Sequence, residues 1–261
     1  MTRAGAADTI WIAIAVALAL YLVLPIILVM LFSFNQSALT SLPLTGLTFD
    51  WYRKLFAQDY FPPALQNSLI VGLAVCLLSV TTGTLAALAL ARMPPATATR
   101  ILYLLALPMM LPALVIGIAL LSYFVRFLTL RLGLVSVILG QLVIVQPFVL
   151  AIVYARLQSF NWAIVDSARD LGASPIRAFF TITLPVIRPT LVGAALIALS
   201  LSLDDFVITF FTIGSGNTLP TMVWGMIRTS LDPTINALAT LLILASIACA
   251  GIALRLSRYR G

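Results

Sequence analysis

The stretch DSARDLGASPIRAFFTITLP, residues 166–185, is a polar and charged segment between long apolar runs of the chain. The whole sequence of 261 residues is 62% hydrophobic and only 9% charged. A soluble domain carries about 25% charged residues, so this chain has too few polar side chains to cover a surface in water. A charged segment kept between apolar runs therefore predicts a contact with a partner outside the membrane.

The apolar runs on both sides of this segment are about 20 residues long, the length that a transmembrane helix needs. Helices satisfy the backbone where the bilayer offers no water, so the predicted fold class is an all-α membrane protein with about six transmembrane helices. The expected spans are 9–34, 65–91, 100–125, 134–155, 187–210 and 234–255. We expect the first to be a retained anchor, because its apolar run is longer than that of a signal peptide, and residues 1–261 to form a single transmembrane domain.

The cationic side chains predict the orientation of these spans. With both termini inside, the inner segments hold Arg3, Arg92, Arg100, Arg156, Arg169, Arg177, Arg188, Arg255, Arg258 and Arg260. The outer segments then hold Arg53, Lys54, Arg126, Arg131 and Arg228. Inner loops carry the excess of Lys and Arg in membrane proteins, so both termini are expected in the cytoplasm. The net charge of +7 then reflects topology, and nucleic-acid binding is not expected.

Catalytic and metal-binding chemistry is not expected either. The sequence has no histidine, which excludes Ser-His-Asp and Cys-His catalysis and the commonest metal ligand. Cys76 and Cys249 fall inside expected spans and are interpreted as small buried hydrophobic residues. The sole lysine, Lys54, lacks the flanking residues of a P-loop. We therefore expect a chain that is not an enzyme, binds no cofactor or metal itself and takes any ATP-derived energy from a separate subunit.

The loop 156–188 is predicted to be folded. Its first half has one apolar helical face, formed by Ile164, Ala168 and Leu171. Gly172 is placed to end that helix, and Ser174 and Pro175 supply an N-cap and a first-turn proline for a second segment. The pattern predicts two short helices at an angle on one face of the membrane.

At these positions the chain resembles the EAA loop of bacterial ATP-binding-cassette (ABC) importer permeases. The loop resemblance rests on Asp166-Ser-Ala168, then Gly172, then Ile182-x-Leu184-Pro185, where Asp-Ser-Ala stands in place of the family's Glu-Ala-Ala. The third expected span contributes Pro108, Pro112 and Gly117. Three further segments resemble the second permease of spermidine/putrescine-type systems, namely Leu201-Ser-Leu-Asp-Asp-Phe206, Thr218-Leu-Pro220 and Ile235-Asn-Ala-Leu238.

The resemblance implies a type I ABC importer permease (MetI-like) fold in the bacterial inner membrane. The loop would be the coupling helix that docks into a groove of an ATPase subunit. The coupling residues implied are Asp166, Ser167, Ala168, Asp170, Leu171, Gly172, Ala173, Ser174, Pro175, Leu184 and Pro185. The partners implied are a homologous permease, an ABC ATPase dimer that holds ATP and Mg, and a periplasmic solute-binding protein. The cargo implied is a polyamine, putrescine or spermidine, carried by alternating access.

The adjacent acids Asp204 and Asp205 follow the uncharged run 190–203 near the outer end of the fifth expected span. A charge within a span is costly, so an intramembrane acid is a candidate functional residue. Neighbours on a helix lie about 100° apart, so the two side chains cannot share one face. We expect at least one of them to help form a cation-selective passage. The alternative is a structural pair that caps the helix or holds a gate.

Trp224 and Asn236 complete the candidate substrate pathway. Trp224 lies on an expected short interfacial helix, and Asn236 stands near the start of the sixth expected span. Either could contact substrate, although an Asn in a span more often bonds a neighbouring helix.

Two other functions stay open on the sequence. The same machine could carry another organic cation, an opine-like compound or an amino-acid derivative. A stand-alone channel or proton-coupled carrier would transport without an ATPase and independently of the loop around Asp166.

Overall fold

The computed structural model describes residues 3–38, 41–229 and 232–258, and within them the side chains of residues 8–38, 41–229, 232–248 and 251. The chain divides into two compact units. The first comprises Met1–Phe61 and Val223–Ala245, and the second comprises Pro62–Met222 and Ser246–Gly261. The expectation of a single domain over 1–261 stays a prediction.

The first unit contains α1 (Arg3–Phe32), α2 (Asp50–Phe56) and parts of α11 (Leu219–Thr229) and α12 (Thr234–Arg258). Two polar contacts hold α2 to the end of α1. The indole N–H of Trp51 donates to the carbonyl of Asn35 at 2.7 Å, and the hydroxyls of Tyr52 and Ser33 lie 2.8 Å apart. The charged helix α2 is therefore fixed at the point where the apolar helix ends.

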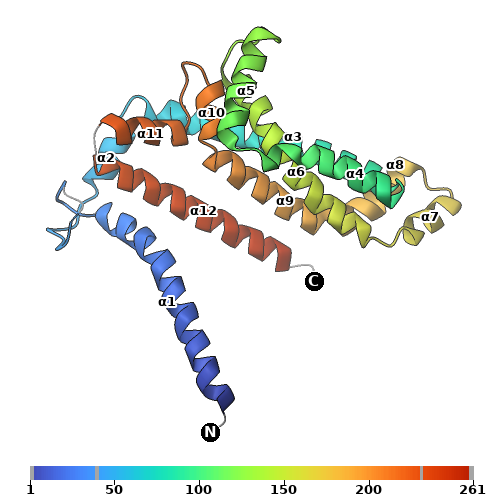
Figure 1. Ribbon diagram of the computed structural model, residues 1–261, viewed down its shortest axis with the longest axis horizontal. Coiled ribbons are helices and arrows are strands. Elements are labelled where there is room, and N and C mark those ends of the chain that lie inside the picture. Colours follow the sequence, from blue (N-terminus) through green and yellow to red (C-terminus); the bar gives the residue numbers. More distant parts are fainter. Residues whose placement is uncertain (1–2, 39–40, 230–231, 259–261) are drawn as a thin grey trace. The chain divides into compact units, whose positions relative to one another are not determined.

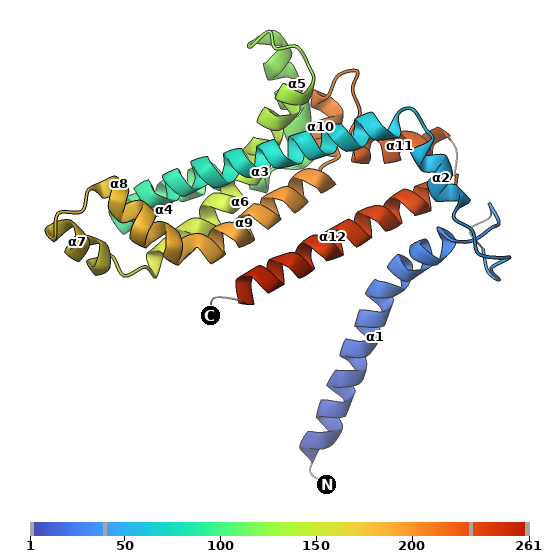
Figure 2. The same cartoon turned by 180° about the vertical axis from the view of Figure 1, so that it is seen from behind.

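The second unit is a helical bundle. Its elements are α3 (Phe61–Ala91), α4 (Pro95–Ala106), the 3-10 turn η1 (Leu107–Met110), α5 (Ala113–Arg126), α6 (Leu134–Gln158), α7 (Ala163–Asp170), α8 (Pro175–Ala178), the π-helical η2 (Phe179–Thr183), α9 (Leu184–Asp204) and α10 (Val207–Thr212). Both views show α3, α6 and α9 running together, with α7 at one end of these helices and α10 at the other (Figures 1 and 2).

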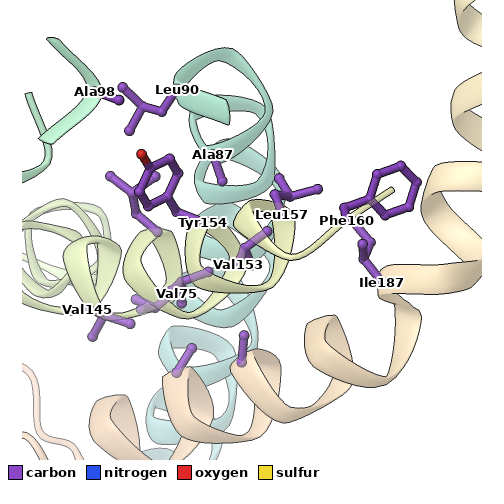
Figure 3. Packing of buried hydrophobic residues seen from close by; sticks show 14 of the residues in the cluster. Val75, Ala87, Leu90, Ala98, Val145, Val153, Tyr154, Leu157, Phe160 and Ile187 are labelled. Atoms are coloured by element: carbon purple, nitrogen blue, oxygen red, sulfur yellow. The ribbon is translucent and has the colours of Figure 1, made fainter. Parts of the chain in front are cut away.

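The core of this unit lies where α3, α6 and α9 meet. Figure 3 shows Val75 of α3, Val153 of α6 and Ile187 of α9 in one buried cluster, and all three are buried. Close approach of α3 to α6 requires Gly83, because a Cβ at this position would lie 2.9 Å from Cγ1 of Val149. Close side-chain packing of this kind holds α3, α6 and α9 together.

The structure describes the side chain of one of the two cysteines that were interpreted as small buried hydrophobic residues. Cys76 is a half-buried free thiol whose Sγ donates to the carbonyl of Ala195 in α9 at 3.3 Å. The side chain of Cys249 lies outside the described residues.

The predicted class, an all-α membrane protein, is confirmed. Among the described residues, the helices long and apolar enough to cross a membrane are Asp8–Phe32, Phe61–Ala91, Leu134–Gln158 and Pro175–Asp204. They correspond to the first, second, fourth and fifth expected spans. The sixth corresponds to α12, whose apolar part within the described residues, Thr234–Ala248, is shorter than the ~20 residues of a full span.

The third expected span, 100–125, is not one straight helix. The chain forms two helical segments, Pro95–Met110 and Ala113–Arg126, that meet at 97°. Leu111 is extended at the break, with ψ 145°, because the ring of the following Pro112 disfavours a helical conformation in the residue before it.

The boundaries predicted for the fifth span, 187–210, are wrong at both ends. The helical run starts at Pro175 and ends at Asp204. Pro185 does not begin the span, because the π-helical turn η2 directly before it relieves the clash between the proline ring and the preceding turn. At the other end, the backbone of Asp205 is extended, with ψ 111°, and α10 starts as a separate helix.

Candidate functional site

The helix end predicted at Gly172 is present in the structure. Gly172 has a φ of +87°. Its N–H donates to the carbonyl of Arg169 at 2.9 Å, and the N–H of Ala173 donates to that of Ala168 at 3.0 Å. These two bonds are the pair that closes a Schellman motif at the end of α7. The position requires a left-handed backbone, which glycine adopts without strain.

The segment after Gly172 begins as predicted but continues further. Oγ of Ser174 accepts from the backbone N–H of Arg177 at 3.2 Å, and Pro175 occupies the first turn. The second short helix of the prediction is therefore the first turn of the spanning run Pro175–Asp204. Leu184 and Pro185 lie inside that run, so the loop is joined to α9 by continuous helix.

Apolar side chains of the loop are left uncovered by the described part of the chain. Ile164 is 51% exposed and Leu171 is 89% exposed, so the predicted apolar face of α7 has no packing partner there. Ile176 and Phe180, on the following segment, are also exposed. Val165 alone turns inward, at 6% exposure. Exposed apolar side chains gathered on a polar loop are typical of a protein interaction surface.

Several predicted loop residues surround one hollow. It has a volume of about 550 Å³ and is lined by Asp166, Arg169, Asp170, Gly172, Ala173 and Pro175. Ser167 is turned to its own helix, where its Oγ donates to the carbonyl of Ala163 at 2.8 Å. The structure thus brings five of the predicted loop residues together around this hollow and leaves Leu184 and Pro185 further along the helix.

The two adjacent acids have different surroundings. Asp205 Oδ2 accepts from the N–H of Thr209 at 2.9 Å and from Oγ1 of Thr209 at 2.8 Å, and Oδ1 accepts from the N–H of Ile208 at 3.4 Å. These donors belong to the first turn of α10, so the Asp205 carboxylate caps that helix. The structural alternative stated for the pair thus describes Asp205.

Gln141 of α6 connects this cap to α9, and the sequence analysis missed it. Its Nε2 donates to Thr209 Oγ1 at 2.9 Å, to the Ser202 carbonyl at 3.3 Å and to Asp205 Oδ2 at 3.3 Å. Its Oε1 accepts from Oγ of Ser202. The side chain is only 2% exposed. An amide side chain within an expected span was the available signal, because such a group must find hydrogen-bond partners in the bundle.

Asp204 is exposed and lines a cavity of about 290 Å³. The other lining residues are Gln141, Ile144, Val145, Leu201, Asp205, Phe206 and Val207. Within the pair, Asp204 is the more exposed carboxylate on this cavity, whereas the Asp205 carboxylate also accepts hydrogen bonds from α10 and from Gln141.

The remaining two pathway candidates belong to the first unit. Trp224 of α11 is 42% exposed, and Asn236 of α12 is half-buried. The hydroxyl of Thr240 donates to the backbone carbonyl of Asn236 at 2.7 Å. The role of all four residues in a substrate pathway stays a prediction.

The loop and the acidic pair lie at opposite ends of α9. This helix has 21 residues, which at 1.5 Å per residue is about 30 Å, the thickness of the hydrocarbon core. Figure 1 shows α7 and α8 beyond one end of α9 and α10 beyond the other. A movement of the loop can therefore reach the acidic pair through one continuous helix.

Comparison with known proteins agrees with this architecture. The chain matches the family described as "binding-protein-dependent transport system inner membrane component" over residues 79–259. The putrescine transport system permease protein PotI of Escherichia coli (strain K12) is 32% identical over 221 residues, which cover 82% of this chain and 78% of the relative. The spermidine/putrescine transport system permease protein PotC of the same strain is 33% identical over 216 residues, which cover 82% and 81%.

Solved structures with the same fold are ABC importers. A bacterial ABC transporter involved in the import of the acidic polysaccharide alginate matches with a TM-score of 0.75 at 17% identity, covering 97% of this chain and 96% of that one. The MetNI methionine ABC transporter matches with a TM-score of 0.56 at 18% identity, covering 77% and 98%. The fold is therefore that of a type I ABC importer permease, and the chain belongs to the family of binding-protein-dependent transport system inner membrane components.

Proposed function

We propose that this chain is a permease subunit of an ATP-driven importer of polyamines, putrescine or spermidine. The observation that carries the proposal is the identity of 32% and 33%, over 82% of the chain, to two permeases named for these solutes. The cargo assignment agrees with an exposed carboxylate, Asp204, on a cavity at one end of the bundle.

The energy for transport comes from a separate ABC ATPase dimer that holds ATP and Mg. Its docking surface on this chain is the loop that contains α7, with Ala168, Leu171 and Gly172 at its centre. The uncovered side chains of Ile164 and Leu171 support this assignment. Burying apolar surface on a partner would remove the cost of holding it in water.

The passage for the cargo involves Asp204. Trp224 and Asn236, in the first unit, are further candidate contacts for the cargo. An ammonium group that leaves water for a narrow passage loses hydration, and a carboxylate offsets that loss. Asp205 lines the same cavity and supports the passage by fixing α10. A homologous permease supplies the other side of the passage, and a periplasmic solute-binding protein delivers the polyamine.

The distribution of arginines supports an orientation with both termini in the cytoplasm of a bacterial inner membrane. The α7 loop then faces the cytoplasm, where ATP is available, and the Asp204 end of α9 faces the periplasm. The two functional ends of this helix thus meet the two partners that alternating access requires.

Uptake of radiolabelled putrescine into proteoliposomes tests the proposal. The vesicles contain this chain with the homologous permease and the ABC ATPase dimer of its importer, and the solute-binding protein is added outside. We expect uptake that requires enclosed ATP and is competed by spermidine but not by an opine or an amino-acid derivative. Putrescine uptake by this chain alone, without ATPase, would contradict the proposal and favour a stand-alone carrier.

A further inference from the structure

We propose that Arg92 is a positioning residue that fixes α7 to the loop-side end of α3 and passes displacement of the loop into that helix. The inference rests on the function proposed above for the loop. The loop is already joined to α9 by continuous helix. Arg92 adds a second connection, from the loop to α3.

Arg92 stands in a rigid turn. It directly follows the last residue of α3, and its N–H still donates to the carbonyl of Ala89 in that helix at 3.2 Å. Two residues later Pro94 begins the first turn of α4, where its carbonyl accepts from the N–H groups of Thr97 and Ala98, both at 3.0 Å. The backbone of Arg92 is therefore held by helices on both sides.

The guanidinium of Arg92 makes two contacts with the beginning of α7. Its central carbon lies 4.0 Å from the centre of the Trp162 ring, a cation–π geometry. Its Nη1 lies 3.9 Å from Oδ1 of Asp166. Trp162 is itself anchored, because its ring meets that of Phe160 edge-on at 4.8 Å and Phe160 is buried in the core of the second unit.

Both contacted residues lie on one face of α7. Trp162 and Asp166 are four positions apart, so their side chains are neighbours along the helix. Ile164 lies two positions from each, about 200° around the helix. The Arg92 contacts therefore hold the back of α7, and the uncovered apolar face with Ile164 and Leu171 is turned to the other side.

Neither contact alone would fix the helix. The side chains of Arg92 and Asp166 are 48% and 55% exposed, and exposed ion pairs are weak. Their combination is directional, because a planar guanidinium that stacks on a ring has its N–H groups left at the edge for a carboxylate. Lysine could place a charge over the ring but could not present such a fork.

The connection leads into the centre of the bundle. α3 packs closely on α6, at Gly83 and Val149. It also packs closely on α9, where a Cβ added to Gly72 would lie 3.1 Å from Cδ1 of Leu199. A loop that moves with an ATPase thus moves α9 through continuous helix and α3 through Arg92. Loss of Arg92 would leave the first path and remove the second.

The test is the number of putrescine molecules imported per ATP hydrolysed by the complete importer in proteoliposomes. We expect Arg92→Gln to lower this ratio by about threefold or more, with the ATPase rate itself retained. Trp162→Leu, which removes the ring, should act in the same direction and serves as a second variant if Arg92→Gln fails to assemble. An unchanged ratio in a well-assembled Arg92→Gln or Trp162→Leu importer would overturn the proposal.

Two further variants separate positioning from general damage. Arg92→Lys keeps a charge over the ring and should stay nearer to wild type than Arg92→Gln does. Arg100→Gln removes the same charge from an exposed site on α4 that has no ion-pair partner within the described part of the chain. It should leave the ratio unchanged, and a loss equal to that of Arg92→Gln would show that only overall charge matters.

If the importer moved no polyamine at all, the proposed function would be contradicted, but the role of Arg92 would not yet be tested. A second measurement tests that role without transport. Amide hydrogen exchange of the full-length chain in lipid nanodiscs reports directly on α7. Exchange across Ala163–Asp170 should be faster in Arg92→Gln than in wild type and unchanged in Arg100→Gln. Equal exchange in all three would overturn the attachment of α7 by Arg92.

Discussion

The Asp205 carboxylate accepts two hydrogen bonds from Thr209, one from the backbone N–H at 2.9 Å and one from Oγ1 at 2.8 Å. With Gln141 as a further donor, the oxygens of this acid are largely occupied by the protein. A mobile ammonium group would have to displace these donors before it could bind. The neighbouring Asp204 is exposed on a cavity that both acids line, so the transport role proposed for the pair falls on Asp204.

We expect Asp205→Ala to destabilise the chain by ~1–2 kcal/mol, because α10 loses its cap and Thr209 loses an acceptor. Asparagine has the same shape as aspartate and keeps one side-chain oxygen as an acceptor, so Asp205→Asn should destabilise the chain less than Asp205→Ala. The measurement is the free energy of unfolding in mixed detergent micelles. Asp204→Ala is the matched control, since the removed side chain is exposed, and it should unfold as wild type does.

Asp204→Asn tests the transport role of the pair. We expect ATP-dependent putrescine uptake to fall by about tenfold, the effect of losing ~1.4 kcal/mol of stabilisation for a dehydrated ammonium group. Thermal stability should be unchanged, and Asp204→Glu should retain most of the uptake because the charge is kept. Full uptake by Asp204→Asn, measured beside wild type at the same level of protein in the membrane, would remove Asp204 from the pathway.

Gln141→Met should show how strongly α6 is joined to α9 and α10. Methionine fills a similar space without polar atoms, so Ser202 and Thr209 each lose a hydrogen-bond partner. Hydrogen bonds between membrane helices contribute on average ~0.6 kcal/mol, and the loss of several should destabilise the chain by ~1–2 kcal/mol. The effect of Ser202→Ala should be smaller in the Gln141→Met background than in wild type. Additive effects would mean that the two side chains do not interact.

Local sequence rules predicted the loop well. Gly172, Ser174 and Pro175 act on their own neighbours, through a left-handed backbone, one side-chain acceptor and one fixed φ. Such effects need no knowledge of the rest of the fold. The apolar composition of the spans likewise gave the class of the protein, because a bilayer restricts the backbone to helices.

The parts that sequence reasoning missed depend on residues far apart in the chain. Gln141 and Asp205 are joined by packing of α6 against α9, and Arg92 meets Trp162 only because α3 ends beside α7. The fifth span was predicted to begin at residue 187, after Pro185, whereas the π-helical turn before that proline lets the helix continue from Pro175. The helix propensity of single residues does not predict a π-helical turn that accommodates a proline.

The close approach of α3 and α6 leads to a packing prediction. A methyl group in Gly83→Ala would meet Val149 Cγ1 at 2.9 Å and the backbone nitrogen of Leu150 at 3.5 Å. Overpacking of this kind costs ~1–3 kcal/mol, and Val149→Ala in the same chain should recover part of the loss. Gly193→Ala in α9 is the control, since no atom lies within 4 Å of its added Cβ. Equal unfolding free energies for Gly83→Ala and Gly193→Ala would argue against this packing.

Gly172→Ala tests whether the angle between α7 and the spanning helix matters for coupling. The φ of +87° is unfavourable for alanine by ~1–2 kcal/mol, so the Schellman motif should open and the loop should lose its fixed direction. We expect faster amide exchange at Gly172 and Ala173 and a lower number of putrescine molecules imported per ATP.

Two further variants serve as controls. Gly172→Asn should have a smaller effect, because asparagine tolerates a left-handed backbone better than other residues with a Cβ. The control is Gly225→Ala, at a position where a Cβ meets nothing within 4 Å, and it should change neither quantity. Because glycine has no side chain and an added Cβ at Gly172 would meet no described atom of this chain within 4 Å, faster amide exchange in Gly172→Ala would come from the backbone conformation that holds α7 in place.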